Sequence, residues 1–333
     1  MYMASLDATK AFDKVNHYRM YAILLRRGLP SVFVNILINW YGKLRVQVRW
    51  RDKMSVLFRV KSGVRQGGIL SPTLFNIYVD SLIVTLRNKR LGCFVKNAYI
   101  GCIMYADDLM LLSASVKELQ KMLDCCGSIG AELGIQFNSK KSLCLTVGPN
   151  NTLKPVAMML NGAEMVWVKK LKYLGVILLY GIKFTIDTSE IRRKFFIAVN
   201  SILSRCKFAS EAVKLDLLEK HCLPILTYCI EVLDLNAIQL KDINAWWNSI
   251  YRKIYGYNKW ESVKELVFYL GRVEIMPTIN IRYLLFLKNI STATNSCMHD
   301  LFINVINDCE LIKACNVFKV KFTWTASELF ATV

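Results

Sequence analysis

The pattern of hydrophobic and polar residues changes its period near residue 180 of this chain. Before that point, short apolar runs alternate with amphipathic stretches of helical period. There we predict strands at 1–7, 44–50, 55–60, 98–104, 109–113 and 143–147, helices at 16–28, 31–41, 72–88 and 116–133, and a hairpin at 172–179. After residue 180, apolar residues recur at helical spacing in the segments 191–203, 215–230, 243–255 and 279–290. The pattern therefore predicts an α+β region followed by a helical region.

Two adjacent carboxylates, Asp107 and Asp108, fall between the apolar runs 99–104 and 109–113. This arrangement predicts a β-hairpin with the acids at its tip. Two like charges side by side are costly unless something positive binds them, and hard oxygen ligands suit Mg²⁺ or Mn²⁺. The alternative is a solvated turn without a ligand.

A third carboxylate, Asp7, ends the apolar segment 1–6. An Asp at a strand end beside the hairpin tip would complete a metal site of three carboxylates. The alternative is that Asp7, or Asp13 further along, caps the helix predicted from about His17. For Asp13, which lies one turn from the helix start, we favour the cap.

A loop at 62–72 contains three glycines and then Ser71-Pro72. Glycine lets the backbone approach a ligand closely, and Ser followed by Pro is typical of a helix start, with Ser71 as the N-cap. A glycine-rich loop that leads into a helix N-terminus suits contact with a phosphate or a base pair. The alternative is an ordinary loop with a good helix cap.

Together these segments resemble, in order and spacing, the motifs of the reverse transcriptase domain of non-LTR (LINE-type) retrotransposons. The matching segments are 5–15, 63–72, 105–108, 134–141 and 172–176. The resemblance extends more loosely to about Lys288. It implies a right-hand polymerase palm, with an antiparallel sheet packed on helices and partial fingers, at 1–179. It also implies an all-α thumb with a post-thumb helical extension at 180–333.

The resemblance further implies catalytic roles for individual residues. Asp7 and Asp107 would hold two Mg²⁺ or Mn²⁺ ions, with Asp108 as the weaker third metal ligand. Phe12 would exclude a 2′-hydroxyl from the incoming nucleotide. Lys141 would lie near the pyrophosphate leaving group as a charge partner or general acid.

Nucleic-acid contacts are implied for a second set of residues. Gln66 and Gly67 would contact the template strand and the incoming base pair, and residues 173–175 would steady the primer 3′ end. The expected substrate- and template-binding residues are Phe12, Gln66, Gly67, Arg65, Tyr105, Asn138, Tyr173 and Gly175.

The implied reaction is RNA-directed DNA synthesis, a nucleotidyl transfer from a dNTP to a primer 3′-hydroxyl assisted by two metal ions. The implied partners are an RNA template, a DNA primer and dNTPs, in an intracellular ribonucleoprotein of the nucleus or cytoplasm, with the oligomeric state left open. One alternative is a catalytically incomplete retrotransposon remnant that only binds nucleic acid. Another is a different palm enzyme, such as a nucleotide cyclase or a DNA-templated polymerase, against which Gln66-Gly67 and the Asn138/Lys141 segment stand.

A separate expectation concerns the length of the fingers region of this chain. In this family a fingers region of considerable length precedes the first motif, whereas six residues precede Asp7 here. We therefore expect a chain truncated at its N-terminus that binds primer–template but extends primers poorly.

The charge balance agrees with a nucleic-acid partner. Lys and Arg number 44 against 25 Asp and Glu, a net charge of +19. Such a basic chain attracts polyanions. The segment 45–49 alternates between basic and apolar residues, which predicts a strand with a basic face. That face contacts the template backbone or is simply solvated. The cations that lead into the glycine-rich loop are Arg45, Arg49, Arg51, Lys53, Arg59, Lys61 and Arg65.

The sequence gives little support for a membrane-spanning or a secreted protein. No apolar run reaches the ~18 residues of a membrane-spanning helix, and no cleavable signal is visible. The eleven cysteines are scattered through apolar segments and odd in number, which favours buried free thiols over a disulfide scaffold.

Overall fold

The computed structural model describes residues 1–149 and 156–293. The described residues form two compact units, the first within 1–94 and 99–184 and the second made of residues 95–98 and 185–293. Each unit has its own hydrophobic core. The predicted α+β fold class is confirmed, although the part of the expected 180–333 segment beyond residue 293 lies outside the described residues.

A six-stranded sheet forms the centre of the first unit. Its strand order is β11-β12-β10-β1-β9-β8, with β10 and β12 parallel and the remaining neighbours antiparallel. The strands are β1 (Tyr2–Asp7), β8 (Cys102–Tyr105), β9 (Asp108–Ser113), β10 (Leu143–Thr146), β11 (Met158–Leu160) and β12 (Ala163–Trp167). The N-terminal strand β1 therefore lies inside the sheet, between β10 and β9.

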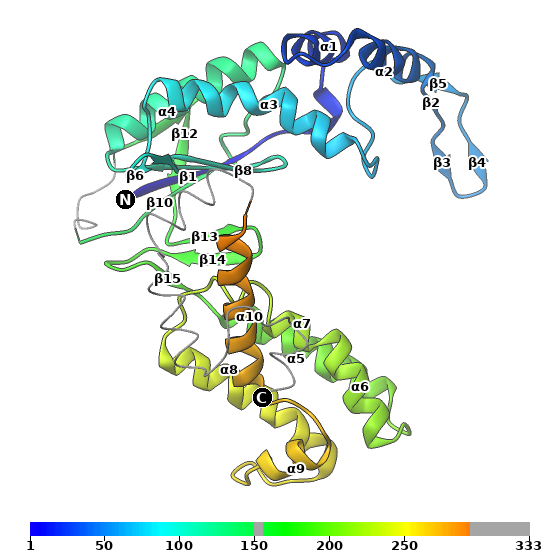
Figure 1. The fold of residues 1–333 in the computed structure, drawn as a ribbon, viewed down its shortest axis with the longest axis vertical. Coiled ribbons are helices and arrows are strands. Elements are labelled where there is room, and N and C mark those ends of the chain that lie inside the picture. Colours follow the sequence, from blue (N-terminus) through cyan, green and yellow to red (C-terminus); the bar gives the residue numbers. More distant parts are fainter. Residues whose placement is uncertain (150–155, 294–333) are drawn as a thin grey trace. The chain divides into compact units, whose positions relative to one another are not determined.

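The two faces of this sheet are covered by different elements (Figure 1). Helices α3 (Ser71–Asn88) and α4 (Val116–Leu133) cover one face, and Ala4 and Leu6 of β1 belong to the core on that side. The hairpin of β13 (Lys170–Tyr173) and β14 (Val176–Leu179) covers the other, where Met3 and Met110 pack with Leu171. This alternation is the two-residue period of a strand buried on both faces.

Two helices and a long hairpin follow β1. A short 3₁₀ turn (Phe12–Lys14) precedes α1 (His17–Arg26), whose N-cap is Asn16, with its side chain accepting the N–H of Arg19. Neither Asp7 nor Asp13 caps this helix, so the capping alternative was wrong for both residues.

Helix α2 (Ser31–Lys43) leads into a hairpin that we call the arm, residues 45–59. Strand β2 (Arg45–Val46) pairs with β5 (Phe58–Arg59), and β3 (Arg49–Trp50) pairs with β4 (Lys53–Met54) nearer the tip. Figure 1 shows the arm extending away from α2. The strands predicted at 44–50 and 55–60 are thus present in shorter pieces.

Several local predictions need correction. Ser71 is the first residue of α3 instead of its N-cap, because its hydroxyl donates to the carbonyl of Arg65. The strand predicted at 98–104 is divided into β7 (Ala98–Tyr99) and β8, and the break falls where Gly101 lies against the backbone of Gly92. The hairpin β11–β12 was not predicted at all. The other short strands are β6 (Phe94–Val95) and β15 (Thr185–Ile186).

The second unit is helical in its described part. Its helices are α5 (Ser189–Arg205), α6 (Glu211–His221), α7 (Leu223–Leu226), α8 (Ala237–Tyr255), α9 (Lys264–Tyr269) and α10 (Ile275–Ser291). The helix predicted at 215–230 is broken between α6 and α7, where Pro224 cannot continue the hydrogen-bond ladder of a helix. Trp247 and Tyr251 of α8 are buried in the core of this unit. No helix among the described residues is long and apolar enough to cross a membrane.

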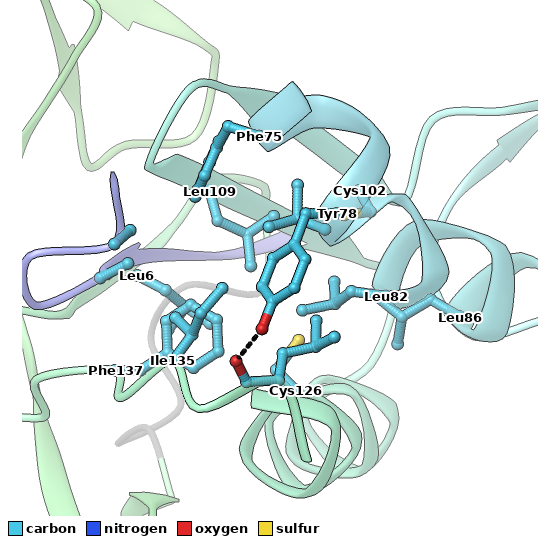
Figure 2. Packing of buried hydrophobic residues seen from close by; sticks show 14 of the residues in the cluster. Leu6, Phe75, Tyr78, Leu82, Leu86, Cys102, Leu109, Cys126, Ile135 and Phe137 are labelled. Atoms are coloured by element: carbon cyan, nitrogen blue, oxygen red, sulfur yellow. Dashed lines mark hydrogen bonds between the residues drawn. The ribbon is translucent and has the colours of Figure 1, made fainter. Parts of the chain in front are cut away.

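Tyr78 of α3 connects three parts of the first unit. It is fully buried, and its hydroxyl donates to the carbonyl of Leu133 at 2.6 Å, at the end of α4 (Figure 2). The same oxygen accepts the N–H of Asn16 at 3.4 Å. The ring itself packs among apolar neighbours that include Leu6 and Leu109 of the sheet (Figure 2).

Replacing Tyr78 by Phe should destabilise the chain by about 1–2 kcal/mol, because it leaves a buried carbonyl and a backbone N–H without their partner. Urea unfolding followed by circular dichroism measures this change. Tyr18→Phe is the matched control, since Tyr18 is 84% exposed and should show almost no effect. Equal stability of Tyr78→Phe and the wild type would mean that this hydrogen bond contributes nothing to the fold.

Candidate active site

The antiparallel pairing of β1 with β9 places Asp7 directly opposite Asp108. The side chains of β1 and β9 alternate, and Met3 and Met110 face the β13–β14 hairpin. Asp7 and Asp108 each lie an even number of residues from these methionines, so both acids lie on that same face at the end of their strands. Residues about a hundred positions apart in sequence thus meet at one edge of the sheet.

Asp107 lies in the tight turn that joins β8 to β9. Tyr105 pairs with Asp108, so only Ala106 and Asp107 form the turn. Ala106 has φ of 53°, a left-handed conformation that is uncommon for residues with a Cβ. Tyr105 is 68% exposed, and both acids of the tip are exposed as well. The hairpin predicted from the sequence is therefore present with its acids accessible.

Residues 136–142 run beside the end of β1. The N–H of Asn138 donates to the carbonyl of Asp7 at 2.9 Å, and the N–H of Asp7 donates to the Ser142 hydroxyl at 3.1 Å. The carbonyl of Asn138 accepts the N–H groups of Lys141 and Ser142, which closes a turn. This turn brings Lys141 Nζ within 3.9 Å of Asp7 Oδ2. The pair is well exposed, so it adds little stability.

The β13–β14 hairpin contacts the carboxylate turn from the other direction. The Tyr173 hydroxyl lies 3.3 Å from the carbonyl of Ile103 and 3.4 Å from that of Asp108. Burial and then the charge of Asp108 raise the pKa of Tyr173 to about 12, so its hydroxyl remains a donor. Leu174 and Gly175 both have positive φ, the geometry of a type I′ two-residue turn.

The glycine-rich loop packs along the chain just after Asp7. The N–H of Gly63 donates to the carbonyl of Val15 and that of Val64 to the carbonyl of Phe12, both at 2.8 Å. Gly63 has φ of 90°, and a Cβ there would lie 2.8 Å from the Asp13 carbonyl oxygen. No larger residue fits at this position without moving the backbone.

Three residues of this loop, Arg65, Gln66 and Gly67, are exposed. Gln66 donates from Nε2 to Asp13 Oδ1 at 3.4 Å, and Gly67 has φ of 79° with open space around its Cα. Arg65 is exposed, and its carbonyl accepts the N–H of Gly68. Asp13, interpreted from the sequence as a helix cap, instead positions Gln66.

Phe12 is half-buried beneath this loop. Its ring stacks on Phe75 of α3, with centroids 4.4 Å apart and planes 15° from parallel. The outer face of the ring is therefore held in one orientation by a fully buried partner.

The negative charges of the carboxylates at the tip repel one another. Burial, followed by the nearby charges of Asp107 and Asp7, raises the pKa of Asp108. Across residues 1–149 and 156–293, no three Asp, Glu, His or Cys side chains converge closely enough to hold a metal ion as they stand. The oxygen-only donor set and its unfavourable charge nevertheless fit a hard divalent cation that would draw the carboxylates together.

The predicted residues thus fall into two groups. The first group is connected by the contacts described above and consists of Asp7, Asp108, Asn138, Lys141 and Tyr173, with Asp107 and Gly175 in their turns and Tyr105 paired with Asp108. The second group consists of Phe12, Arg65, Gln66 and Gly67. It is linked to β1 through residues 8–15, along which the glycine-rich loop packs. Ser142 and His17, whose Nε2 lies 2.7 Å from the Gly63 carbonyl, were missed because no local pattern marks a partner so distant in sequence.

Curated relatives are proteins of mobile elements. The chain is 36% identical over 147 residues to the Pol polyprotein of the type-2 retrotransposable element R2DM of Drosophila melanogaster, covering 44% of this chain and 14% of the relative. It is 26% identical over 266 residues to the RNA-directed DNA polymerase from mobile element jockey of Drosophila funebris, covering 75% and 28%. The chain therefore spans well under a third of the length of these relatives.

The chain also resembles a solved structure and matches a family model. Apo telomerase from Candida tropicalis aligns with a TM-score of 0.47 at 13% identity, over 95% of this chain and 53% of that one. The sequence model of the family described as reverse transcriptase (RNA-dependent DNA polymerase) matches residues 1–178. Since that match covers more than half of the chain, and the relatives come from elements such as R2 and jockey, the chain belongs to the reverse transcriptase family, as a reverse transcriptase domain of a non-LTR retrotransposon.

Proposed function

We propose that this chain carries the polymerase centre of a retrotransposon enzyme that copies RNA into DNA. The observation that carries the proposal is the pairing of Asp7 with Asp108 on one face of the sheet, with Lys141 Nζ at 3.9 Å from Asp7. Family membership supports the same reaction class. The substrates would be a dNTP and a primer 3′-hydroxyl paired to an RNA template.

Asp7, Asp107 and Asp108 would hold two divalent cations, Mg²⁺ or Mn²⁺. When bound, such ions lower the pKa of an attacking hydroxyl and offset negative charge on a leaving pyrophosphate. Lys141 enters the same region from the 136–142 turn, where its ammonium would neutralise a phosphate oxygen or donate a proton to the leaving group. The Asn138 turn fixes where this ammonium can reach.

Template and primer would meet the site from two directions. Gln66 and Gly67, with Arg65 beside them, present an exposed loop that would contact the template base and the incoming pair. Tyr173 and Gly175 lie in the hairpin that contacts the carboxylate turn, where they would steady the primer 3′ end. Tyr105 and Asn138 would border the nucleotide between these two contacts.

The two units would have different roles in the polymerase, and these roles follow from their architecture. Residues 1–179 would form the palm with partial fingers, because they hold the sheet, the carboxylates and the glycine-rich loop. Residues from 180 onward would form the thumb and a helical extension, because their described part is an independent helical core.

The decisive experiment is primer extension on poly(rA)/oligo(dT) with Mg²⁺ or Mn²⁺. Asp107→Asn should abolish extension, because it removes one of the carboxylate charges that would bind the ions. Glu164→Gln is the charge-matched control, since Glu164 is an exposed residue of β12 on the same sheet. Binding of primer–template without extension by the unchanged chain would favour the alternative of a catalytically incomplete nucleic-acid binder.

Phe12→Val should admit ribonucleotides, because it opens space beside the incoming sugar. The rNTP/dNTP discrimination should fall by about 10- to 200-fold, the range that one small group is worth in a pocket. The lost stack on Phe75 should also lower stability by about 1 kcal/mol. Phe94→Val is the control for loss of a phenyl ring elsewhere. Unchanged discrimination by Phe12→Val, with lower stability, would assign Phe12 to the core alone.

Without divalent cations, Asp108→Asn should raise the melting temperature at neutral pH and have little effect at a pH below the usual carboxyl pKa. The pKa of Asp108 is raised in the folded chain, so the protonated form is favoured there and the charged form costs stability. This cost grows as the pH rises through the carboxyl range and is absent when Asp108 is protonated. Calorimetry in chelator at both pH values measures it. A lower melting temperature at neutral pH would contradict the proposed charge repulsion.

A further inference from the structure

The glycine-rich loop is held to the first unit at a buried point. Gly63 and Val64 are buried, whereas the residues on either side of them are exposed. Residues 60–70 form neither helix nor strand, so a ladder of regular hydrogen bonds does not fix the loop. Gln66 follows two residues later and is exposed. The position of Gln66 therefore depends on how firmly the buried point is held.

The peptide unit between Gly63 and Val64 forms a hydrogen bond at each end. The N–H of Val64 donates to the carbonyl of Phe12 at 2.8 Å, and the carbonyl of Gly63 lies 2.7 Å from Nε2 of His17. A carbonyl oxygen can only accept, so Nε2 of His17 carries the proton and donates it. These two bonds together fix the plane of the peptide.

Gly63 is the residue at which such a restraint matters. Its φ is 90°, and glycine moves between positive and negative φ at little steric cost, so the peptide that follows it can rotate. Rotation would take the Val64 N–H away from its acceptor. It would also leave the buried Gly63 carbonyl without a donor, which is unfavourable. The imidazole of His17 opposes this rotation.

His17 is itself firmly supported. It is the first residue of α1, and its side chain is buried, with 8% of the residue exposed. Its ring lies against Tyr41 of α2, with centroids 4.7 Å apart. The N–H of the preceding residue, Asn16, donates to the Tyr78 hydroxyl of α3. The imidazole thus links the loop to three helices of the first unit.

The restrained peptide adjoins residues that the proposed function uses. The carbonyl that accepts the Val64 N–H belongs to Phe12, and the next residue, Asp13, accepts a hydrogen bond from Gln66 Nε2 at 3.4 Å. Release of the peptide would therefore loosen the segment at residues 12–13 together with the side chain of Gln66.

We propose that His17 is a positioning residue, which holds the Gly63 carbonyl and thereby keeps Gln66 oriented toward the template base. This inference rests on the proposed function, because it takes Gln66 as the template contact. His17 acts through the backbone of the loop and is not a catalytic residue.

The first measurement is hydrogen exchange of the Val64 amide in the chain without substrates, relative to the amides of β9. His17→Phe keeps a ring against Tyr41 but has no donor, and exchange should become about ten-fold faster, the effect of one lost hydrogen bond. His17→Gln carries an amide N–H that can reach the Gly63 carbonyl, so it should restore slow exchange. His17→Leu replaces His17→Phe if the larger ring prevents folding.

The second measurement is the affinity for primer–template in chelator, as a double-mutant cycle with Gln66→Ala. His17→Phe should weaken binding about five-fold in the unchanged chain and have no further effect in the Gln66→Ala chain, because it acts through Gln66. His17→Gln should bind as the unchanged chain does.

Met20→Ala is the matched control in both measurements. Met20 is a fully buried residue of the same helix, so the substitution should lower the stability of the whole unit. It should not accelerate exchange at Val64 relative to β9, and it should leave the affinity for primer–template unchanged.

Four results would overturn the inference. They are unchanged Val64 exchange in His17→Phe, fast exchange in His17→Gln as well, which would assign the effect to ring packing, additive losses in the cycle, and full affinity in Gln66→Ala. The proposed function fails separately. A chain that shows the expected exchange and cycle in chelator, yet extends no primer with Mg²⁺ or Mn²⁺, would retain the role of His17 and lose the polymerase activity.

Discussion

The register between β1 and β9 is the constraint on which the rest of the site depends. A shift of one residue would move every side chain of β1 to the other face, placing Asp7 toward the helices and Met3 away from its partners. The buried contacts on both faces oppose such a shift, because Ala4 and Leu6 pack under α3 and α4 while Met3 packs with Leu171. Two apolar cores therefore fix the position of two charges.

That position is electrostatically unfavourable in the free chain. Burial raises the pKa of Asp108, and the charges of Asp107 and Asp7 raise it further, while Lys141 at 3.9 Å from Asp7 is too exposed to offset the repulsion. Under the proposed function stability and ion binding would be opposed here, as is common at sites that bind an ion or a phosphate. The surrounding hydrogen bonds, from Asn138, Ser142 and Tyr173, hold the backbone where the charges alone would push it apart.

The sequence predicted the elements of the first unit well because strong apolar periodicity marks α3, α4, β1 and β9. Its predictions differ from the structure at two short turn or breaker signals and wherever the deciding contact lies far away in sequence. Asn161-Gly162, the strongest two-residue hairpin signal, separates β11 from β12 in a segment without predicted strands, and Pro224 falls inside the helix predicted at 215–230. The contacts of Asp13 with Gln66 and of His17 with Gly63 have no local signal, because they depend on tertiary packing.

The arm has a further consequence for the behaviour of the chain in concentrated solution. A two-stranded ribbon has two edges, and each edge presents backbone N–H and C=O groups that a second molecule can pair with. Exposed Val56, Leu57 and Phe58 make such pairing more favourable. Arg45 and Arg59 lie side by side at the base, so two arms that approach one another bring cations together. The same cations thus keep this ribbon from becoming a seed for intermolecular sheets.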